Sequence, residues 1–283
     1  MKNILSDSQA STLHNFAHQR VLLAFDFDGT LAPIVRNPAI ATMRARTSSL
    51  LTKVAKAYPC VVISGRSRVD VMKKVAAIPL RAVIGSHGME PSRNLRNAHW
   101  LAALWHAQLA STLPHIAGVV LEDKGVSLAV HYRQARARAA IRRLVLIAAA
   151  DLDNARIVEG KMVVNILPAG APDKSTALLA LCKRLRCESA IYVGDDDNDE
   201  DVFALARQGR LLGIRIGRSS RSQAAYFLPS QAAIDQLLVR LLDALPIVPS
   251  GGADQPSSGL AAVNPRPARY PRGSGPIQVS RRG

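Results

Sequence analysis

The sequence contains few cysteines, few aromatic residues and no long apolar segment. Three of its 283 residues are cysteines, Cys60, Cys182 and Cys187, and aromatic residues make up 4%. An odd number of cysteines at unrelated spacings indicates free thiols in a reducing compartment rather than a disulfide framework or a zinc site. No run of about 18 apolar residues could cross a membrane, and residues 1–16 lack the continuous apolar region of a secretion signal. We therefore expect a cytoplasmic protein without a membrane partner.

Acidic residues are also scarce, with 21 Asp and Glu against 37 Lys and Arg and a formal net charge of +16. Such a charge is typical of proteins that bind nucleic acid, an anionic membrane surface or a small anionic substrate. Five arginines and one acid lie in residues 250–283, whereas the other basic residues are spread over predicted helices and loops. Without a dense basic run or aromatic residues on which bases could stack, we expect no nucleic-acid partner. We interpret the charge as a basic shell that attracts a small anionic substrate.

Hydrophobic residues make up 48% of the chain, which suffices for a core and excludes wholesale disorder. Short apolar runs alternate with helical segments in residues 1–89 and again in residues 169–247. Such runs are typical of strands buried on both faces, and their alternation with helices predicts an α/β fold with a parallel sheet. The predicted strands are 21–25, 60–63, 82–84, 190–193 and 211–216, and the predicted helices are a short one within 1–19, then 42–57, 67–77, 172–186, 199–208 and 230–245.

The pattern changes between residues 90 and 168. Helices are predicted at 98–113 and 134–150, each followed by a hairpin, at 119–132 and 156–167, with Glu159-Gly160-Lys161 at the second turn. This order predicts an α+β domain with an antiparallel sheet, inserted into the α/β core and called the lid below. Residues 248–283 are rich in Pro, Gly, Ser and Arg, and we expect a disordered basic tail.

Two carboxylates follow the first predicted strand, in Asp26-Phe27-Asp28-Gly29-Thr30. Because side chains alternate along a strand, Asp26 and Asp28 should point the same way and Phe27 back into the core. Open α/β sheets bind ligands at the carboxyl ends of their strands, where these acids would lie. A plain Asp-Gly turn with solvated acids is an alternative interpretation.

A serine and a lysine occupy positions suited to an anion. Ser64, in Ser64-Gly65-Arg66, follows the second predicted strand and could donate to an anion, although Ser-Gly is also a common turn. Lys174 lies in the first turn of a predicted helix, where the helix dipole disfavours a cation unless an anion is bound. The pair favours a phosphate site, with a solvated surface lysine as the alternative for Lys174.

A third acidic segment, residues 194–201, follows the strand at 190–193 and reads Gly-Asp-Asp-Asp-Asn-Asp-Glu-Asp. So many acids beside a buried strand would repel one another without a cation. Oxygen ligands with no His or Cys nearby suit Mg²⁺ rather than zinc. A charged helix N-terminus is the alternative, and it explains Asp199 and Glu200 better than Asp195 and Asp196.

In this order and context, the Asp-x-Asp-Gly-Thr, Ser, Lys and Gly-Asp-Asp motifs resemble those of the haloacid dehalogenase superfamily of phosphotransferases, over about residues 20–245. The resemblance implies a Rossmann-like core, an inserted lid of the C2 cap type and Mg²⁺ as cofactor. It implies that Asp26 is the nucleophile that forms an aspartyl-phosphate, and that Asp28 protonates the leaving alcohol and then activates water. The remaining roles it implies are phosphoryl binding by Thr30, Ser64 and Lys174, Mg²⁺ binding by Asp26, the backbone carbonyl of Asp28 and Asp195, and support of the metal by Asp196 and Asp199.

In finer detail, the chain is similar to the trehalose-6-phosphate phosphatase family. The matching stretches are 25–34, 64–66, 85–90, 122–133 and 194–201. By this resemblance, Glu122 and Lys124 reach from the lid to sugar hydroxyls, while His87, Glu90 and the nearby Arg66 line the core side. A charged hairpin turn is the alternative for Glu122 and Lys124, and a packed loop histidine is the alternative for His87.

The chain departs from the family at two places. Asn165 replaces the glutamate usual before the proline of the second lid hairpin, and Asp197-Asn198 differs from the usual acidic motif, in which threonine takes the place of Asn198. We expect activity to survive, with a possible change in sugar selectivity or in the metal shell. Asn165 keeps an acceptor but lacks the charge.

The resemblance implies a Mg²⁺-dependent phosphatase that hydrolyses trehalose 6-phosphate to trehalose and phosphate, in trehalose biosynthesis, and we expect a monomer. Two alternatives remain at this stage. The first is a phosphatase of the same superfamily for another sugar phosphate. The second is a basic nucleic-acid-binding or non-catalytic regulatory protein, against which the intact Asp26, Asp28, Lys174 and Asp195 argue.

Overall fold

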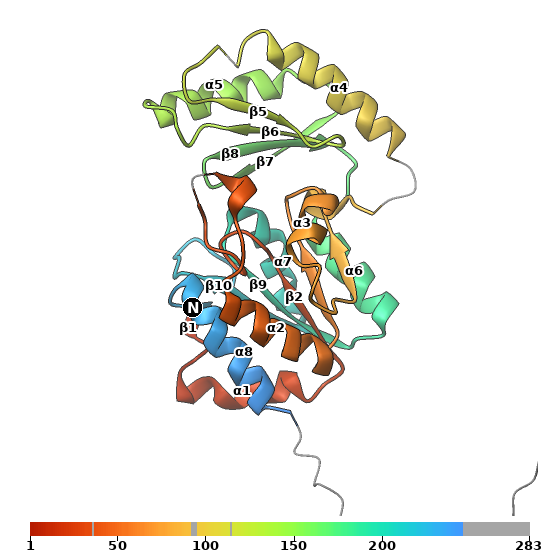
Figure 1. Ribbon diagram of the computed structural model, residues 1–283, viewed down its shortest axis with the longest axis vertical. Helices are drawn as coiled ribbons and strands as arrows, with labels where there is room; N and C mark the ends of the chain where they lie inside the picture. Colours follow the sequence, from red (N-terminus) through yellow and green to blue (C-terminus); the bar gives the residue numbers. More distant parts are fainter. Residues whose placement is uncertain (36, 92–94, 114, 246–283) are drawn as a thin grey trace, which may run out of the picture. The chain divides into compact units, whose positions relative to one another are not determined.

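Two β-sheets organise the chain in the computed structural model, which describes residues 1–35, 37–91, 95–113 and 115–245 (Figure 1). The larger sheet has seven strands, all paired in parallel. In spatial order they are β1 (Lys2–Asn3), β11 (Tyr226–Leu228), β10 (Leu211–Ile216), β9 (Ser189–Gly194), β2 (Val21–Phe25), β3 (Cys60–Ile63) and β4 (Ala82–Ile84). The predicted α/β core with a parallel sheet is therefore confirmed.

Helices cover both faces of the parallel sheet, because its central strands are apolar on both faces. Leu23 and Phe25 of β2 pack in one cluster and Leu22 and Ala24 in another, as the period of two requires. The first cluster includes side chains of α1 (Ala10–Ala17), α2 (Ala45–Ala57), α3 (Arg68–Lys74) and α8 (Ile234–Asp243). The second includes side chains of α6 (Lys174–Leu185) and α7 (Glu200–Ala204).

The lid contains an antiparallel sheet of four strands, in the spatial order β5 (Val120–Asp123), β6 (Leu128–His131), β8 (Val163–Pro168) and β7 (Ala155–Gly160). Its helices, α4 (Arg96–Ala110) and α5 (Arg138–Ala150), lie on the same face of this sheet (Figure 1). Leu128 and Val130 of β6 pack against Trp105 and Val145 of these helices. Ala129 and His131 alternate with them and thus point to the opposite face.

Several details differ from the sequence-based expectation. The strands β1 and β11, which were not predicted, have only two and three residues, too few to show a side-chain period. The second lid turn is shifted, because β7 continues through Gly160, so that Lys161 and Met162 form the turn. The helix predicted at 199–208 is divided into α7 and the 3-10 helix η5 (Leu205–Gln208). The other short 3-10 helices are η1 (Asp7–Gln9), η2 (Pro38–Ile40), η3 (Ser86–Gly88), η4 (Asp197–Asp199) and η6 (Gln231–Ala233).

The predicted tail, 248–283, lies outside the described residues. Within the ranges that the structure describes, no helix combines the length and apolar character needed to traverse a membrane.

Candidate active site

Three neighbouring strands end where the predicted site residues begin. Asp26 follows β2, Ser64 follows β3 and Asp195 follows β9. The register aligns these ends, since Phe25 pairs with both Val62 and Val193. The strand order reverses between β9 and β2, and such a point is where open α/β sheets hold ligands. The side chain of Phe27 is fully buried in the core, as predicted.

A cavity of about 210 Å³ lies at these strand ends, and lid residues form part of its lining. Most of the predicted site residues line it: Asp26, Asp28, Ser64, Arg66, His87, Glu122, Lys124, Lys174, Asp195 and Asp196. Thr30, Glu90 and Asp199 do not. The cavity therefore joins both carboxylate motifs, the serine, the lysine and the lid hairpin.

Lys174 is buried between two carboxylates rather than solvated on the surface. It is the first residue of α6, and its Nζ donates to Asp26 Oδ1 at 3.0 Å and to Asp199 Oδ1 at 2.7 Å. Burial opposes its charge, but the carboxylates of Asp199 and Asp26 outweigh this and raise the pKa of Lys174. Burial also raises the pKa of Asp26 well above its usual value, against the opposing charge of Lys174. The alternative of a surface lysine is thus wrong.

Asp26, Asp195 and Asp199 are buried and each offers a carboxylate oxygen within 4.8 Å of the others, close enough to share a metal ion. The Asp199 oxygens are already engaged, Oδ1 by Lys174 and the Tyr192 hydroxyl, and Oδ2 by the backbone N–H groups of Asp195 and Asp196. Asp26 and Asp195 are therefore the better candidates for metal ligands, and an oxygen-only set of this kind would suit Mg²⁺.

Asp195 lies against the loop that follows Asp26. A Cβ at Gly29, whose φ is +78°, would overlap Asp195 Oδ2, so only glycine fits there. Burial raises the pKa of Asp195 to about 6, although the nearby Lys161 ammonium opposes the shift. Its ionisation is thus sensitive to the cations around it.

Asp196 holds the loop after β9 through hydrogen bonds. Its Oδ1 accepts from the N–H of Asp197 at 2.9 Å, and its Oδ2 accepts from Asn198 Nδ2 and from the N–H of Lys161, both at 3.2 Å. Asp196 and Asp199 also form a capping box around η4. Asp196 therefore fits the alternative interpretation of an acid at a helix N-terminus. Asp195 does not, because its carboxylate lies close to that of Asp26.

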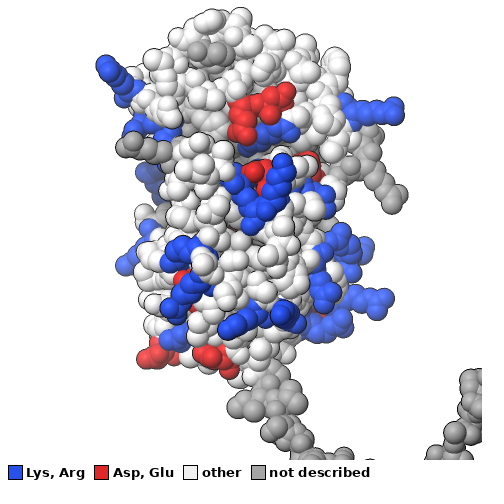
Figure 2. Space-filling view, viewed as in Figure 1, with Lys and Arg blue, Asp and Glu red and all other residues white. Residues whose placement is uncertain are grey.

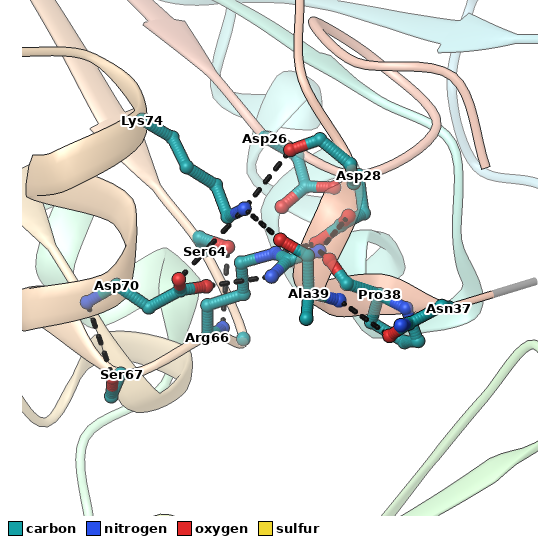
Figure 3. Close-up of polar contacts among 12 residues, drawn as sticks. Asp26, Asp28, Asn37, Pro38, Ala39, Ser64, Arg66, Ser67, Asp70 and Lys74 are labelled. Atoms are coloured by element: carbon teal, nitrogen blue, oxygen red, sulfur yellow. Dashed lines mark hydrogen bonds and ion pairs between the residues drawn. The ribbon is translucent and has the colours of Figure 1, made fainter. Parts of the chain in front are cut away.

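Arg66 contacts the second carboxylate of the first motif. Its Nε and Nη2 donate to Asp28 Oδ2 and Oδ1 at 2.5 and 2.7 Å, and Nη2 also donates to the carbonyl of Pro38 at 2.7 Å (Figure 3). Its Nη1 donates to Asp70 Oδ2 at 2.6 Å. The Asp28 carboxylate is thus oriented by arginine and lies outside the group of three acids that, among the described residues, could share a metal ion.

The two predicted phosphate hydroxyls differ in position. Ser64 lines the cavity, and its Oγ accepts from the N–H of Arg66 at 3.2 Å, so its own proton can donate to an anion. Thr30 is fully buried outside the lining, and no described residue forms a hydrogen bond with its Oγ1.

His87 and Glu90 occupy the loop after β4. His87 is buried at the cavity with φ +56°, and its ring nitrogens have no hydrogen-bond partner among the described residues. Burial, and then the charges of Lys124 and Lys174, lower the pKa of His87 well below its usual value, which keeps the ring neutral. Glu90 instead holds the loop, accepting from Ser86 Oγ and the N–H of Arg68 at 2.7 and 2.8 Å.

The first lid hairpin reaches the core through Lys124. Its Nζ donates to the carbonyl of Gly65 at 3.0 Å and to Asn165 Oδ1 at 3.2 Å. Burial lowers the pKa of Lys124. Glu122 Oε2 lies 2.6 Å from His131 Nε2, and this hydrogen bond lowers the pKa of Glu122. Both side chains line the cavity, which a hairpin turn facing only solvent would not do.

Four ionisable residues of the cavity lining were not predicted as site residues: Asp70, His131, Arg133 and Lys161. The alternation of β6 could have identified His131, because a strand that buries Leu128 and Val130 turns His131 to the other face. The sequence signal available for Lys161 was its predicted position at the second lid turn. Its Nζ forms an ion pair with Asp195 Oδ2, a contact between residues far apart in the sequence.

Comparison with known proteins agrees with this geometry. The family model described as trehalose-phosphatase matches residues 24–232. The chain belongs to the trehalose-phosphatase family. A trehalose-phosphate phosphatase of Mycobacterium avium is 34% identical over 268 residues, covering 87% of this chain and 68% of that protein. A probable trehalose-phosphate phosphatase D of Arabidopsis thaliana is 28% identical over 251 residues, covering 80% of this chain and 68% of that protein.

A solved structure supports the fold. The C-terminal domain of the C. albicans trehalose-6-phosphate phosphatase has a TM-score of 0.68 at 19% identity, covering 83% of this chain and 96% of that one. The haloacid dehalogenase-like fold expected from the motifs is thus confirmed, and membership in the trehalose-phosphatase family makes the chain a phosphoric monoester hydrolase.

Proposed function

We propose that the residues around Asp26 carry out the reaction of the family, the hydrolysis of trehalose 6-phosphate to trehalose and phosphate, which belongs to trehalose biosynthesis. The observation that supports this most is the buried contact of Lys174 with Asp26 at the carboxyl end of β2. An ammonium beside a carboxylate nucleophile offsets the repulsion between that carboxylate and a phosphate monoester.

In the first proposed step, the Asp26 carboxylate attacks phosphorus and the bond from phosphorus to the sugar oxygen breaks. Asp28 gives its proton to that oxygen, and trehalose leaves. In the second step, Asp28 takes a proton from water, whose oxygen attacks phosphorus and releases Asp26 and phosphate. Ser64 and Lys174 hold the phosphoryl oxygens.

The carboxylates of Asp26 and Asp195, with the backbone carbonyl of Asp28, would hold Mg²⁺, and Asp196 and Asp199 fix the loop around it. When bound, Mg²⁺ would neutralise charge on the phosphoryl oxygens. The choice of Mg²⁺ rests on the oxygen-only donors and their burial.

The lid and the loop after β4 together supply the proposed sugar site. Glu122, Lys124 and His87 present an acceptor, a donor and a neutral ring to the cavity, which suits a polyhydroxy substrate. We propose residues 90–168 as a lid domain inserted into a core made of 1–89 and 169–247. We also propose a cytoplasmic, monomeric enzyme without a nucleic-acid partner, and the scattered basic side chains of Figure 2 support this last point.

The test is a substrate panel assayed with Mg²⁺ and again with EDTA. We expect the highest kcat/KM for trehalose 6-phosphate, lower values for glucose 6-phosphate and a small aryl phosphate, and loss of activity with EDTA. Equal values across the panel would contradict the proposed selectivity. A preference for another disaccharide phosphate would instead favour a phosphatase of the same superfamily for that sugar phosphate. Asn165, in place of the glutamate usual in the family, is the observation that motivates this alternative.

A further inference from the structure

The β7–β8 turn of the lid places a cation on the acidic loop that follows β9. Lys161 Nζ forms its ion pair with Asp195 Oδ2, while the backbone N–H of Lys161 donates to Asp196 Oδ2 at 3.2 Å. From the end of β6, Arg133 Nη2 donates to the carbonyl of Lys161 at 3.1 Å. The proposed reaction uses none of these contacts.

The shapes of the turn and the loop fit this contact closely. A Cβ at Gly160 would lie 2.7 Å from Asp196 Oδ2, so a larger residue would displace the two segments. Met162 completes the turn in the left-handed region, with φ +64°. The backbone itself thus brings Lys161 to Asp195, with Arg133 holding the turn from the other side.

The two partners of the ion pair differ in their access to water. The Lys161 side chain is 44% exposed, whereas that of Asp195 is 3% exposed. The ammonium can therefore move into solvent at little cost, while the buried carboxylate needs a cation beside it. A divalent ion bound to the same carboxylate would repel the ammonium at this short range.

We propose that Lys161 competes with the metal ion for Asp195, so that docking of the lid turn weakens metal binding and a bound metal weakens the docking. The two effects must be equal in free energy, because they are one coupling between two sites. The inference rests on the metal site of the proposed function and adds a lid residue that tunes its affinity.

The test measures Mn²⁺ binding to the full chain without substrate, from the electron paramagnetic resonance signal of free Mn²⁺ at low ionic strength. Lys161→Met removes the charge and keeps the length of the side chain, and we expect about 2- to 5-fold tighter binding, the range for a partly exposed ion pair. Lys161→Arg keeps the charge and should bind like the original chain. The gain from Lys161→Met should shrink in high salt.

Two further variants complete the experiment. Arg143→Met removes an exposed charge from α5 and should leave Mn²⁺ affinity unchanged, which controls for net charge. Asp195→Asn should abolish the binding. If the original chain and Lys161→Met bind Mn²⁺ equally, the competition is refuted and the metal site stands. If the original chain does not bind Mn²⁺ saturably, or if Asp195→Asn binds it equally well, the metal site and the competition are both refuted.

Discussion

The guanidinium group of Arg66 spans both carboxylate oxygens of Asp28, a paired contact that fixes the plane of the carboxylate. The side chain of Arg66 is itself held from three sides. Asp70 and the carbonyl of Pro38 accept from it, and its guanidinium carbon lies 5.6 Å from the centre of the Phe27 ring. The orientation of the proposed general acid thus depends on a helix and a loop outside its own motif.

Asp70 is accordingly expected to act as a positioning residue. Asp70→Asn weakens the charged contact with Arg66 and should lower kcat for trehalose 6-phosphate by roughly 3- to 10-fold, with KM little changed, because the acid is misplaced rather than the sugar. Steady-state kinetics check this, with Asp153→Asn on the lid surface as the control. Asp70→Glu should restore part of kcat, and an unchanged kcat in Asp70→Asn would refute the role.

Asp26→Asn should reduce turnover by at least about 1,000-fold, because an amide cannot form the aspartyl-phosphate. The melting temperature should not fall. Burial raises the pKa of Asp26, so its ionised form costs stability at neutral pH, and a neutral amide removes that cost while Lys174 keeps Asp199 as partner. Kinetics and thermal unfolding of the purified variant check both points. Substantial hydrolysis by folded Asp26→Asn would rule out Asp26 as the nucleophile.

Metal binding should weaken as the pH falls through about 6. Burial raises the pKa of Asp195 to about 6, and a carboxylate must lose its proton to bind a cation. Below that value the proton competes with the metal, so the dissociation constant should rise by up to about tenfold per pH unit. Titrations of Mn²⁺ between pH 5 and 7.5 check this. A dissociation constant that stays flat over this range would remove Asp195 from the metal site.

The sequence was most informative where one local pattern determines the structure. The runs 21–25 and 60–63 are apolar throughout because both faces of these strands are buried, and their ends fix where Asp26 and Ser64 lie. By contrast, the strand β11, which lies between β1 and β10, has only three residues, too few for a side-chain period to appear in the sequence.

The site was harder to predict where separate segments meet. Lys161 reaches Asp195 only because the lid turn docks on the loop after β9, and no local pattern encodes that docking. Position in a motif also does not fix the direction of a side chain. Thr30 and Glu90 belong to matching stretches, yet Thr30 is buried outside the cavity lining and Glu90 binds its own loop and the N–H of Arg68.

Asn165 offers a test of sugar recognition, because its Oδ1 lies 3.2 Å from Lys124 Nζ in the cavity. Asn165→Glu restores the acid usual in the family and pairs a charge with Lys124, whose charged form burial disfavours. We expect KM for trehalose 6-phosphate to fall by roughly 3- to 10-fold, as an oriented charged pair strengthens hydrogen bonds to sugar hydroxyls. KM for a small aryl phosphate should stay the same, since that substrate does not reach the lid. Asn165→Gln, which has the size without the charge, should not improve KM, and an equal change for both substrates would show that residue 165 does not recognise the sugar.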